Sequence, residues 1–223
     1  MNSCPEASVY MVELSSINRH DINNQVTVIL GFLQMLEAKQ PDPSLSEYFR
    51  TLKTASKRIS AMIQFGKEYE KIGVTAPVWQ ECRTLVDAAA MQASLGTIAV
   101  KNDLPAHAEV FADPLIEKVF YNLMDNAIRY GGTITTIRFS LEARNGDMIL
   151  VCEDDGEGIV ADEKNVIFER GFGKNTGLGL ALSREILSIT GITISETGEP
   201  GKGARFELMI PGEAFRFAPS RKE

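Results

Sequence analysis

The sequence is poor in cysteine and histidine and has no long hydrophobic run. Its 223 residues include three cysteines, none in a Cys-x-x-Cys pair, and two histidines, so neither a disulfide framework nor a structural zinc site is expected. The longest apolar stretch, residues 26–36, is interrupted by Gly31 and Gln34 and falls short of the roughly 18–20 residues that span a bilayer. The N-terminus lacks the basic-then-apolar pattern of a secretion signal. These absences favour a reducing, cytoplasmic compartment and predict no membrane contact in this chain.

Positive charge is also scarce. The chain has 23 Lys and Arg against 30 Asp and Glu, and it contains no basic cluster, so nucleic acid is not an expected partner. Residues 1–71 carry eight charges of each sign, whereas the rest of the chain holds the whole net charge of −7. Between these parts, residues 72–77 contain a glycine and a proline and show no helical periodicity. We therefore predict a first unit over 1–71, a linker over 72–80 and a second unit over 81–223.

Two heptad patterns predict a helical hairpin in the first unit. Apolar residues recur at spacings of three and four at Ile22, Val26, Ile29, Leu33 and Leu36, and again at Tyr48, Leu52, Ala55, Ile59 and Met62. Pro41 and Pro43 separate the two patterns, and Ser44 and Glu47 have the spacing of a capping box at the start of the second helix. The apolar stripe is wider than one hairpin can cover. We expect a second copy of the chain to complete a four-helix bundle, with cover by the second unit as the alternative.

Four polar residues lie outside the predicted seam. In the register of the first helix, His20 and Asn24 are one turn apart on the solvent face, with Asp21 and Gln25 beside them. An exposed histidine by itself indicates only a solvated side chain. Neutral imidazole is nevertheless a nucleophile at neutral pH, and a neighbouring carboxylate raises its basicity.

The second unit alternates between helical and strand patterns. Helices are predicted over 82–95, 115–130 and 181–189, and strands over 97–100, 108–111, 133–143 and 148–153. The Asn145-Gly146 pair is typical of a hairpin turn between the last two strands. This alternation predicts an α/β sandwich, followed by a frayed tail from Pro211 onward.

One helix of the second unit carries an unusual polar face. Asn122 and Asn126 lie four residues apart, and Arg129 and Tyr130 follow one turn later. Because asparagine is a mediocre helix former, this spacing indicates a face turned toward a ligand, although the apolar residues of the helix are explained by core packing alone.

Two glycine-rich segments follow. The first ends an apolar strand at Asp155, Gly156 and Gly158, where glycine permits positive φ and a carboxylate can accept a hydrogen bond from an amine. The second, Gly177-Leu178-Gly179-Leu180, opens a helix and offers backbone N–H groups to phosphate. The Walker spacing is absent, and each segment alone is unspecific.

In chain order these segments resemble a known family. His20-Asp21, Asn122 to Ala127, Asp155 to Gly158, Ile167 to Arg170 and Gly177 to Leu180 are similar to the H, N, G1, F and G2 boxes of sensor histidine kinases of two-component signalling. The resemblance covers nearly the whole chain. It implies an α+β protein, in which a two-helix hairpin forms a dimeric four-helix bundle and precedes an α/β-sandwich ATP-binding domain of the histidine kinase and gyrase type.

The resemblance also implies an activity. A homodimer would use the cofactors ATP and Mg²⁺ to phosphorylate His20, and would then transfer the phosphoryl group to an aspartate of a response-regulator receiver domain. Asp21 would orient or deprotonate the imidazole. The resemblance leaves open whether the chain is the cytosolic portion of a larger sensor.

A nucleotide-binding set is implied residue by residue. Asn122 would hold Mg²⁺, and Asp155 would accept a hydrogen bond from the adenine amino group above the turn at Gly156 and Gly158. Residues 160–176 would form a mobile lid. The remaining members, expected near the phosphates or the adenosine, are Asn126, Arg129, Tyr130, Lys174, Gly177, Leu178, Gly179 and Leu180.

The H box departs from the commonest family form, because Asp21 replaces glutamate and no proline follows. Asn24 and Gln25 stand four and five residues after His20, where different subfamilies carry a residue that orients a hydrolytic water. Phosphatase activity toward the regulator is therefore a further hypothesis, with either residue as its carrier.

Two other functions share these motifs. Gyrase-type and mismatch-repair ATPases, and a group of serine protein kinases, resemble the chain in the N and glycine boxes but place a catalytic glutamate four residues before the first asparagine. Here that position is Lys118, and Glu117 lies on a different helical face, which favours transfer to histidine. The second alternative is a non-catalytic nucleotide-binding scaffold that dimerises; the intact Asn122, Asp155 and Gly177 argue against it.

Overall fold

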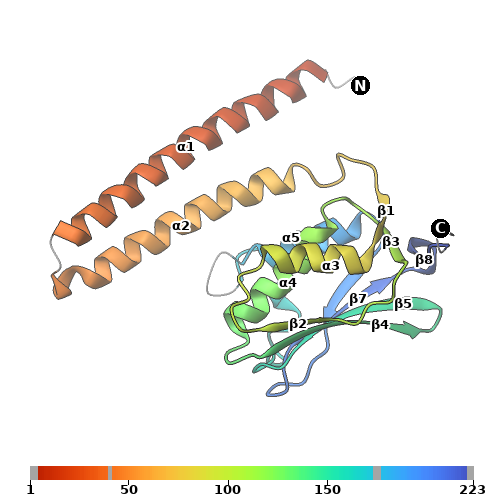
Figure 1. Cartoon of the computed structure of the whole chain (residues 1–223). Helices are drawn as coiled ribbons and strands as arrows, with labels where there is room; N and C mark the ends of the chain where they lie inside the picture. Colours follow the sequence, from red (N-terminus) through yellow and green to blue (C-terminus); the bar gives the residue numbers. More distant parts are fainter. Residues whose placement is uncertain (1–4, 40–41, 173–176, 220–223) are drawn as a thin grey trace. The chain divides into compact units, whose positions relative to one another are not determined.

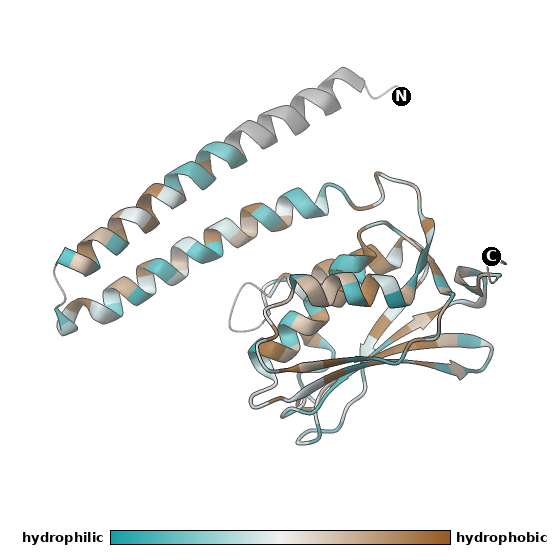
Figure 2. Cartoon of the chain, in the orientation of Figure 1, coloured by the Kyte–Doolittle hydropathy of each residue, from teal (hydrophilic) through white to brown (hydrophobic). Residues whose placement is uncertain are grey.

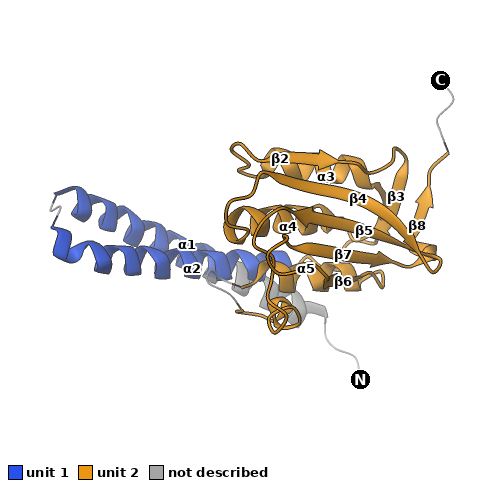
Figure 3. Ribbon diagram, turned by 90° about the horizontal axis from the view of Figure 1, so that it is seen from below, with its two compact units in different colours: residues 1–70 blue, residues 71–223 orange. Residues whose placement is uncertain are grey.

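A computed structural model describes residues 5–39, 42–172 and 177–219, with side chains from Arg19 onward. The chain divides into two compact units, residues 1–70 and 71–223 (Figures 1 and 3). The division falls one residue before the predicted end of the first unit. Within the described ranges, no helix combines the length and apolar character that a bilayer crossing requires.

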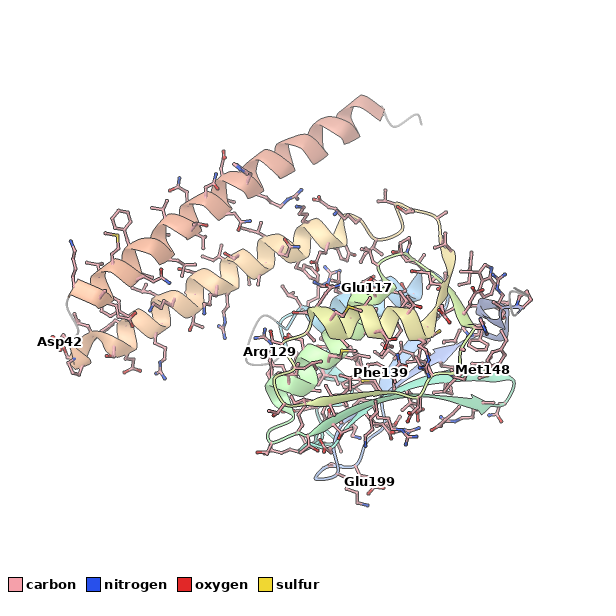
Figure 4. The ribbon with its side chains drawn as sticks, in the orientation of Figure 1. Asp42, Glu117, Arg129, Phe139, Met148 and Glu199 are labelled. Atoms are coloured by element: carbon pink, nitrogen blue, oxygen red, sulfur yellow. The ribbon has the colours of Figure 1, made fainter. Side chains whose placement is uncertain are left out.

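The first unit is a helical hairpin, as predicted. Helix α1 spans Pro5–Lys39 and α2 spans Ser46–Tyr69 (Figure 1). The start of α2 differs from the predicted capping box. The side chain of Asp42 (labelled in Figure 4) accepts a hydrogen bond from Ser44 N at 2.9 Å, and a short 3₁₀ helix, Pro43–Leu45, precedes α2. Ser44 therefore lies inside a turn capped by Asp42, because Pro43 favours that turn over an immediate α-helix.

The two helices pack through a different face of α2 from the one predicted. On α1, two members of the predicted seam, Val26 and Leu33, are buried at 3% and 7% exposure, whereas Ile22, Ile29 and Leu36 are exposed. On α2 the buried residue is Ser56, and Lys53 on the same side pairs with Glu37 of α1. The predicted α2 seam is exposed instead, at Tyr48, Leu52, Ala55, Ile59 and Met62. A small serine allows close helix approach, so the apolar stripe is left on the outside of the hairpin, and Figure 2 shows further hydrophobic residues in the C-terminal half of α1.

The second unit is built on a five-stranded sheet with the order β2-β4-β5-β7-β6. Its strands are β2 Ala99–Asn102, β4 Thr136–Arg144, β5 Asp147–Asp154, β6 Thr193–Glu196 and β7 Arg205–Ile210. Strand β2 runs parallel to β4, and the other neighbours are antiparallel. Helices α3 Cys82–Gln92, α4 Ile116–Tyr130 and α5 Gly179–Ser188 cover one face (Figure 1). Phe120 of α4 meets Phe139 of β4 edge to face at 6.0 Å in this core. The predicted α/β architecture is thus confirmed.

A second, three-stranded sheet corrects two expectations. Strands β1 Val78–Glu81, β3 Ala108–Ala112 and β8 Phe215–Phe217 pair in the order β1-β3-β8. Strand β1 begins inside the predicted linker, and β8 lies in the tail that was expected to fray. Backbone pairing with β3 holds both strands, and the Arg216 guanidinium lies 4.1 Å from the centre of the Trp79 ring. Strand β8 pairs with β3, which lies about a hundred residues earlier in the chain, so the composition of the tail alone did not indicate a strand.

A charge network covers the face of the five-stranded sheet that is turned away from the helices. Arg205 pairs with Glu142, Glu153 and Glu207 at 2.7, 2.5 and 3.1 Å, and Arg144 donates to Glu207 at 2.8 Å. On the same face, two apolar side chains are completely buried, Ile149 and Val151. The long charged side chains therefore cover an apolar surface that no helix shields.

This network predicts acid sensitivity. Hydrogen bonding to Arg144 lowers the pKa of Glu207 to about 2. Because this value lies below the unfolded one, the stabilisation is complete above pH ~4.5 and is lost as the pH falls toward 2. We expect Glu207→Gln to lower the free energy of unfolding at neutral pH by about 2 kcal/mol, and the difference from wild type to shrink toward pH 3. Urea unfolding at several pH values measures it, with the exposed Glu213→Gln as control. A difference that stays constant with pH would contradict the assignment.

Candidate functional site

His20 lies on the exposed surface of α1, with 75% of its side chain accessible. Its Nδ1 is 3.3 Å from Asp21 Oδ1 and 3.3 Å from Asn24 Nδ2. Both contacts converge on one ring nitrogen, and no described residue hydrogen-bonds to Nε2. A carboxylate at Nδ1 favours the tautomer with its proton there, which leaves the Nε2 lone pair free. In that tautomer Nδ1 has no lone pair for Asn24 Nδ2, so Asn24 lies close to the ring without donating to it. Three of the four predicted residues are thus in contact, and Gln25 is exposed beside them.

An ion pair that the sequence did not reveal lies next to this histidine. Arg19 donates to both carboxylate oxygens of Glu70, at 2.5 and 2.7 Å. This bidentate pair ties α1 at the level of His20 to the end of α2. Its two members are 51 residues apart, so no local pattern could have indicated it.

Asn122 joins α4 to the first turn of α5. Its Nδ2 donates to the carbonyl oxygen of Gly179 at 3.0 Å and to Ser183 Oγ at 3.1 Å. These two bonds use the amide hydrogens and leave Oδ1 for a ligand. The structure thereby brings a fixed side-chain oxygen to the N-terminus of α5, where the helix dipole and backbone N–H groups favour an anion.

The other predicted residues of α4 divide into two kinds. The Nδ2 of Asn126 is buried and has no hydrogen-bond partner among the described residues. A buried unpaired donor is costly, so Asn126 needs an acceptor, from a ligand or a water molecule, that the described residues do not supply. Arg129, at the end of α4 (Figure 4), donates to Asp125 at 2.7 Å, and this bond raises the pKa of Arg129. Tyr130 follows it and is 43% exposed.

Asp155 has partners other than the predicted adenine. Its Oδ1 accepts from Thr135 N at 2.8 Å and Thr136 N at 3.1 Å, and its Oδ2 accepts from Thr135 Oγ1 at 2.5 Å. These bonds hold the pKa of Asp155 at about 2. Both oxygens therefore already accept hydrogen bonds at the start of β4, and Asp155 ties two turns together.

The neighbouring Asp154 is a second carboxylate at this turn, which the sequence motifs did not single out. Its Oδ1 accepts from Gly156 N at 2.9 Å and Ala204 N at 3.1 Å, whereas no described residue donates to Oδ2. Burial raises the pKa of Asp154. The alternation of side chains along a strand distinguishes the two aspartates. Asp154 shares the helix-facing side of β5 with Cys152, whereas Asp155 lies beyond the end of the strand.

The glycines allow close contacts between backbone segments. A Cβ on Gly156 would lie 2.2 Å from the carbonyl oxygen of Gly131, and one on Gly158, where φ is +71°, would lie 2.8 Å from Gly203 O. Gly177 has φ +60°, and its Cβ would lie 2.2 Å from Phe172 O. A side chain would separate these segments, so the turn at 156–158 packs on the end of α4.

Two further predicted residues flank the start of α5. Leu178 precedes the helix and its carbonyl accepts from Leu182 N at 2.9 Å, and Leu180 lies in the first turn. A Cβ on Gly179 would approach Asn122 Cγ at 3.5 Å, an ordinary contact, so this glycine is not required by space. Lys174 and the end of the predicted lid lie outside the described residues.

Glu117 is the carboxylate next to Lys118, the position at which gyrase-type ATPases carry their catalytic glutamate. Glu117 accepts a hydrogen bond from Gln92 of α3, and Figure 4 shows it beside that helix. Lys118 lies 5.0 Å from the centre of the Tyr121 ring. Glu117 is therefore held by α3 and is not available as a base that activates water.

Two family models match the chain. The His Kinase A (phospho-acceptor) domain matches residues 11–72, and the family described as histidine kinase-, DNA gyrase B-, and HSP90-like ATPase matches residues 112–214. These ranges contain, respectively, His20 and the site around Asn122.

Curated relatives and a solved structure agree with these models. The signal transduction histidine-protein kinase AtoS of Escherichia coli is 29% identical over 89% of this chain and 34% of its own length. The sensory histidine kinase/phosphatase NtrB of Klebsiella oxytoca is 26% identical over 86% of this chain and 60% of its own. The chain thus spans less than two thirds of either relative. The crystal structure of full-length ShkA in complex with AMPPNP has the same fold, with a TM-score of 0.65, 20% identity and cover of 93% of this chain and 47% of that one.

Proposed function

Because this chain belongs to the sensor histidine kinases of two-component signalling, we propose that it transfers the γ-phosphoryl group of ATP to His20. The phosphoryl group then passes to an aspartate of a response-regulator receiver domain. The observation that supports the proposal is the exposed imidazole whose polar neighbours, Asp21 and Asn24, both lie at Nδ1, so that Nε2 is free to react. The direct test is covalent labelling of the chain by γ-labelled ATP in an acid-labile, alkali-stable form.

In this reaction His20 is the nucleophile. Its Nε2 lone pair attacks the γ-phosphorus, an N–P bond forms, and the bond to the oxygen that bridges the β- and γ-phosphates breaks to release ADP. The proton on Nδ1 stays between the ring and Asp21. The carboxylate, 3.3 Å away, stabilises the positive charge that develops on the imidazole.

The residues around Asn122 fit a nucleotide with its metal. Asn122 Oδ1 is an oxygen ligand of the kind Mg²⁺ prefers, and the described residues contain no group of three acidic, histidine or cysteine side chains that could cage a metal alone. A metal here would therefore be held by Asn122 together with phosphate oxygens. When bound, Mg²⁺ neutralises charge on the phosphates. The buried amide of Asn126 and the N-terminus of α5 supply donors to the same anion, and AMPPNP in the ShkA complex supports an adenine nucleotide as ligand.

Asp154, and not Asp155, is proposed to accept from the adenine amino group. In Asp154→Asn an amide oxygen would keep the bonds to Gly156 N and Ala204 N, and the amide nitrogen would then face the amino group, donor against donor. We expect the dissociation constant for Mg·ADP to rise about tenfold or more, and to change less than about threefold in Asp155→Asn, which loses stability instead. Isothermal titration calorimetry measures both. Equal losses in the two variants, or a loss in Asp155→Asn alone, would sink the assignment.

A homodimer is part of the proposal. The five exposed seam residues of α2, together with Ile22, Ile29 and Leu36 of α1, form an apolar stripe that the hairpin does not bury. A second copy of the chain would bury both stripes in a four-helix bundle in the cytoplasm.

Phosphatase activity is a second candidate function. The side-chain amide of Asn24 lies 3.3 Å from the ring of His20 and is not used by the protonated Nδ1, so it could orient a water beside the receiver's phosphoryl group. This contact favours Asn24 over Gln25 as the carrier. The relative NtrB is itself named a kinase/phosphatase.

A further inference from the structure

A buried ion pair joins the segment after Gly158 to strand β6. Lys164 Nζ lies 2.8 Å from Glu196 Oε2 and also donates to the carbonyl oxygen of Gly198. The Glu196 side chain is completely buried, and that of Lys164 is 20% exposed. The contact at Oε2 is an ion pair, since this oxygen has no hydrogen-bond partner among the described residues, and Lys164 supplies the charge opposite the buried carboxylate.

The other oxygen of Glu196 organises the β6–β7 loop, residues 197–204, which carries Glu199 (Figure 4). Glu196 Oε1 accepts from Gly198 N at 3.0 Å and from Arg205 N at 3.2 Å. One carboxylate therefore holds both ends of the loop and, through Lys164, links the loop to the first part of the segment predicted as the lid, residues 160–176.

The β6–β7 loop supports the turn that presents Asp154. Ala204 N donates to Asp154 Oδ1 at 3.1 Å, and Gly201 N donates to the carbonyl oxygen of Glu157 at 2.7 Å. Gly158 packs so closely on Gly203 that a Cβ there would lie 2.8 Å from its carbonyl oxygen. The loop is thus one of two supports for the Asp154 carboxylate, the other being Gly156 N, and it helps to fix where the second oxygen lies.

We propose that Lys164 and Glu196 are positioning residues for the adenine end of the nucleotide site. The pair holds the β6–β7 loop against the turn at 154–158, so that Asp154 Oδ2 is fixed for the adenine amino group. This inference rests on the proposed function. Neither residue contacts the nucleotide, and because ADP and AMPPNP share the adenine, loss of the pair weakens both ligands by the same factor.

The test measures nucleotide affinity in variants of the full chain. In Lys164→Met we expect the dissociation constants for Mg·ADP and Mg·AMPPNP each to rise about tenfold, and the KM for ATP in autophosphorylation to rise similarly while kcat stays within about twofold. Lys164→Arg keeps the charge and restores both affinities to within about threefold of wild type. The matched control is Lys202→Met, which breaks the exposed 2.5 Å pair with Glu199 in the same loop and leaves both affinities unchanged.

Several outcomes would overturn the inference. They are wild-type ADP affinity in a folded Lys164→Met, a loss confined to AMPPNP, or an equal loss in Lys202→Met. Should circular dichroism show Lys164→Met to be unfolded, the double variant Lys164→Met/Glu196→Gln makes the same comparison, because it buries no unpaired carboxylate. If Asp154→Asn weakens binding and Lys164→Met does not, this inference alone fails. If the wild-type chain binds neither nucleotide, the proposed function fails and takes the inference with it.

Discussion

In the His20→Gln variant we expect no covalent labelling by γ-labelled ATP. Glutamine has a similar polar reach but no nucleophilic nitrogen, so no N–P bond can form. The affinity for Mg·ADP is expected to stay at the wild-type value, because the nucleotide residues all belong to the second unit. The labelling assay with Mg²⁺, followed by acid and alkali treatment, measures the first quantity, and calorimetry measures the second.

The control for this experiment is the other histidine of the chain. His107 lies in a loop with φ +63°, a conformation that asparagine also adopts, so His107→Asn removes the imidazole without backbone strain. We expect His107→Asn to label like the wild type. Persistent acid-labile label in His20→Gln would mean that another residue accepts the phosphoryl group.

Asn122→Asp is expected to reduce the initial rate of labelling at saturating Mg·ATP by roughly two to three orders of magnitude. The change keeps the side-chain shape but removes both N–H donors, so a carboxylate oxygen would face the carbonyl oxygen of Gly179. It also adds a negative charge beside the proposed phosphate position. The start of α5 would shift, and its backbone N–H groups would no longer be aimed at the nucleotide.

Ser183→Ala separates the structural part of this effect from the catalytic part. It removes one of the two acceptors of Asn122 Nδ2 and leaves Oδ1 in place. We expect Ser183→Ala to lose about 1 kcal/mol of stability and to keep its labelling rate within roughly fivefold. Thermal unfolding of both variants reports the stability. An equal loss of rate in the two variants would show that Asn122 acts only by tying α4 to α5.

Features with a short sequence period or local turn chemistry were predictable. From Ile22 to Leu36, apolar residues recur three or four positions apart, and this pattern predicted a helix where α1 lies. The Asn145-Gly146 pair predicted the hairpin between β4 and β5, and both residues have positive φ, 55° and 95°. The order of the boxes along the chain likewise indicated the family, which the two family models confirm.

Choices between adjacent residues were less predictable. Asp154 and Asp155 are the same residue type, and they differ in that Asp154 is the last residue of β5 whereas Asp155 follows it. The backbone amides of Thr135 and Thr136 donate hydrogen bonds to Asp155. The outward stripe of α2 is a comparable case. A heptad pattern shows that a helix has an apolar side, but whether that side meets the partner helix or a further molecule depends on packing.

The sequence by itself determined the helical hairpin, the α/β alternation of the second unit and the family, because each is encoded in windows of a few residues or in the order of such windows. Only the tertiary structure decided which groups meet. Arg19 with Glu70, Asn122 with Gly179, Asp154 with Ala204 and Lys164 with Glu196 are separated by 51, 57, 50 and 32 residues. No local propensity specifies such contacts. They arise because folding buries the groups together, and a buried polar group must then find a partner among whatever the topology brings to it.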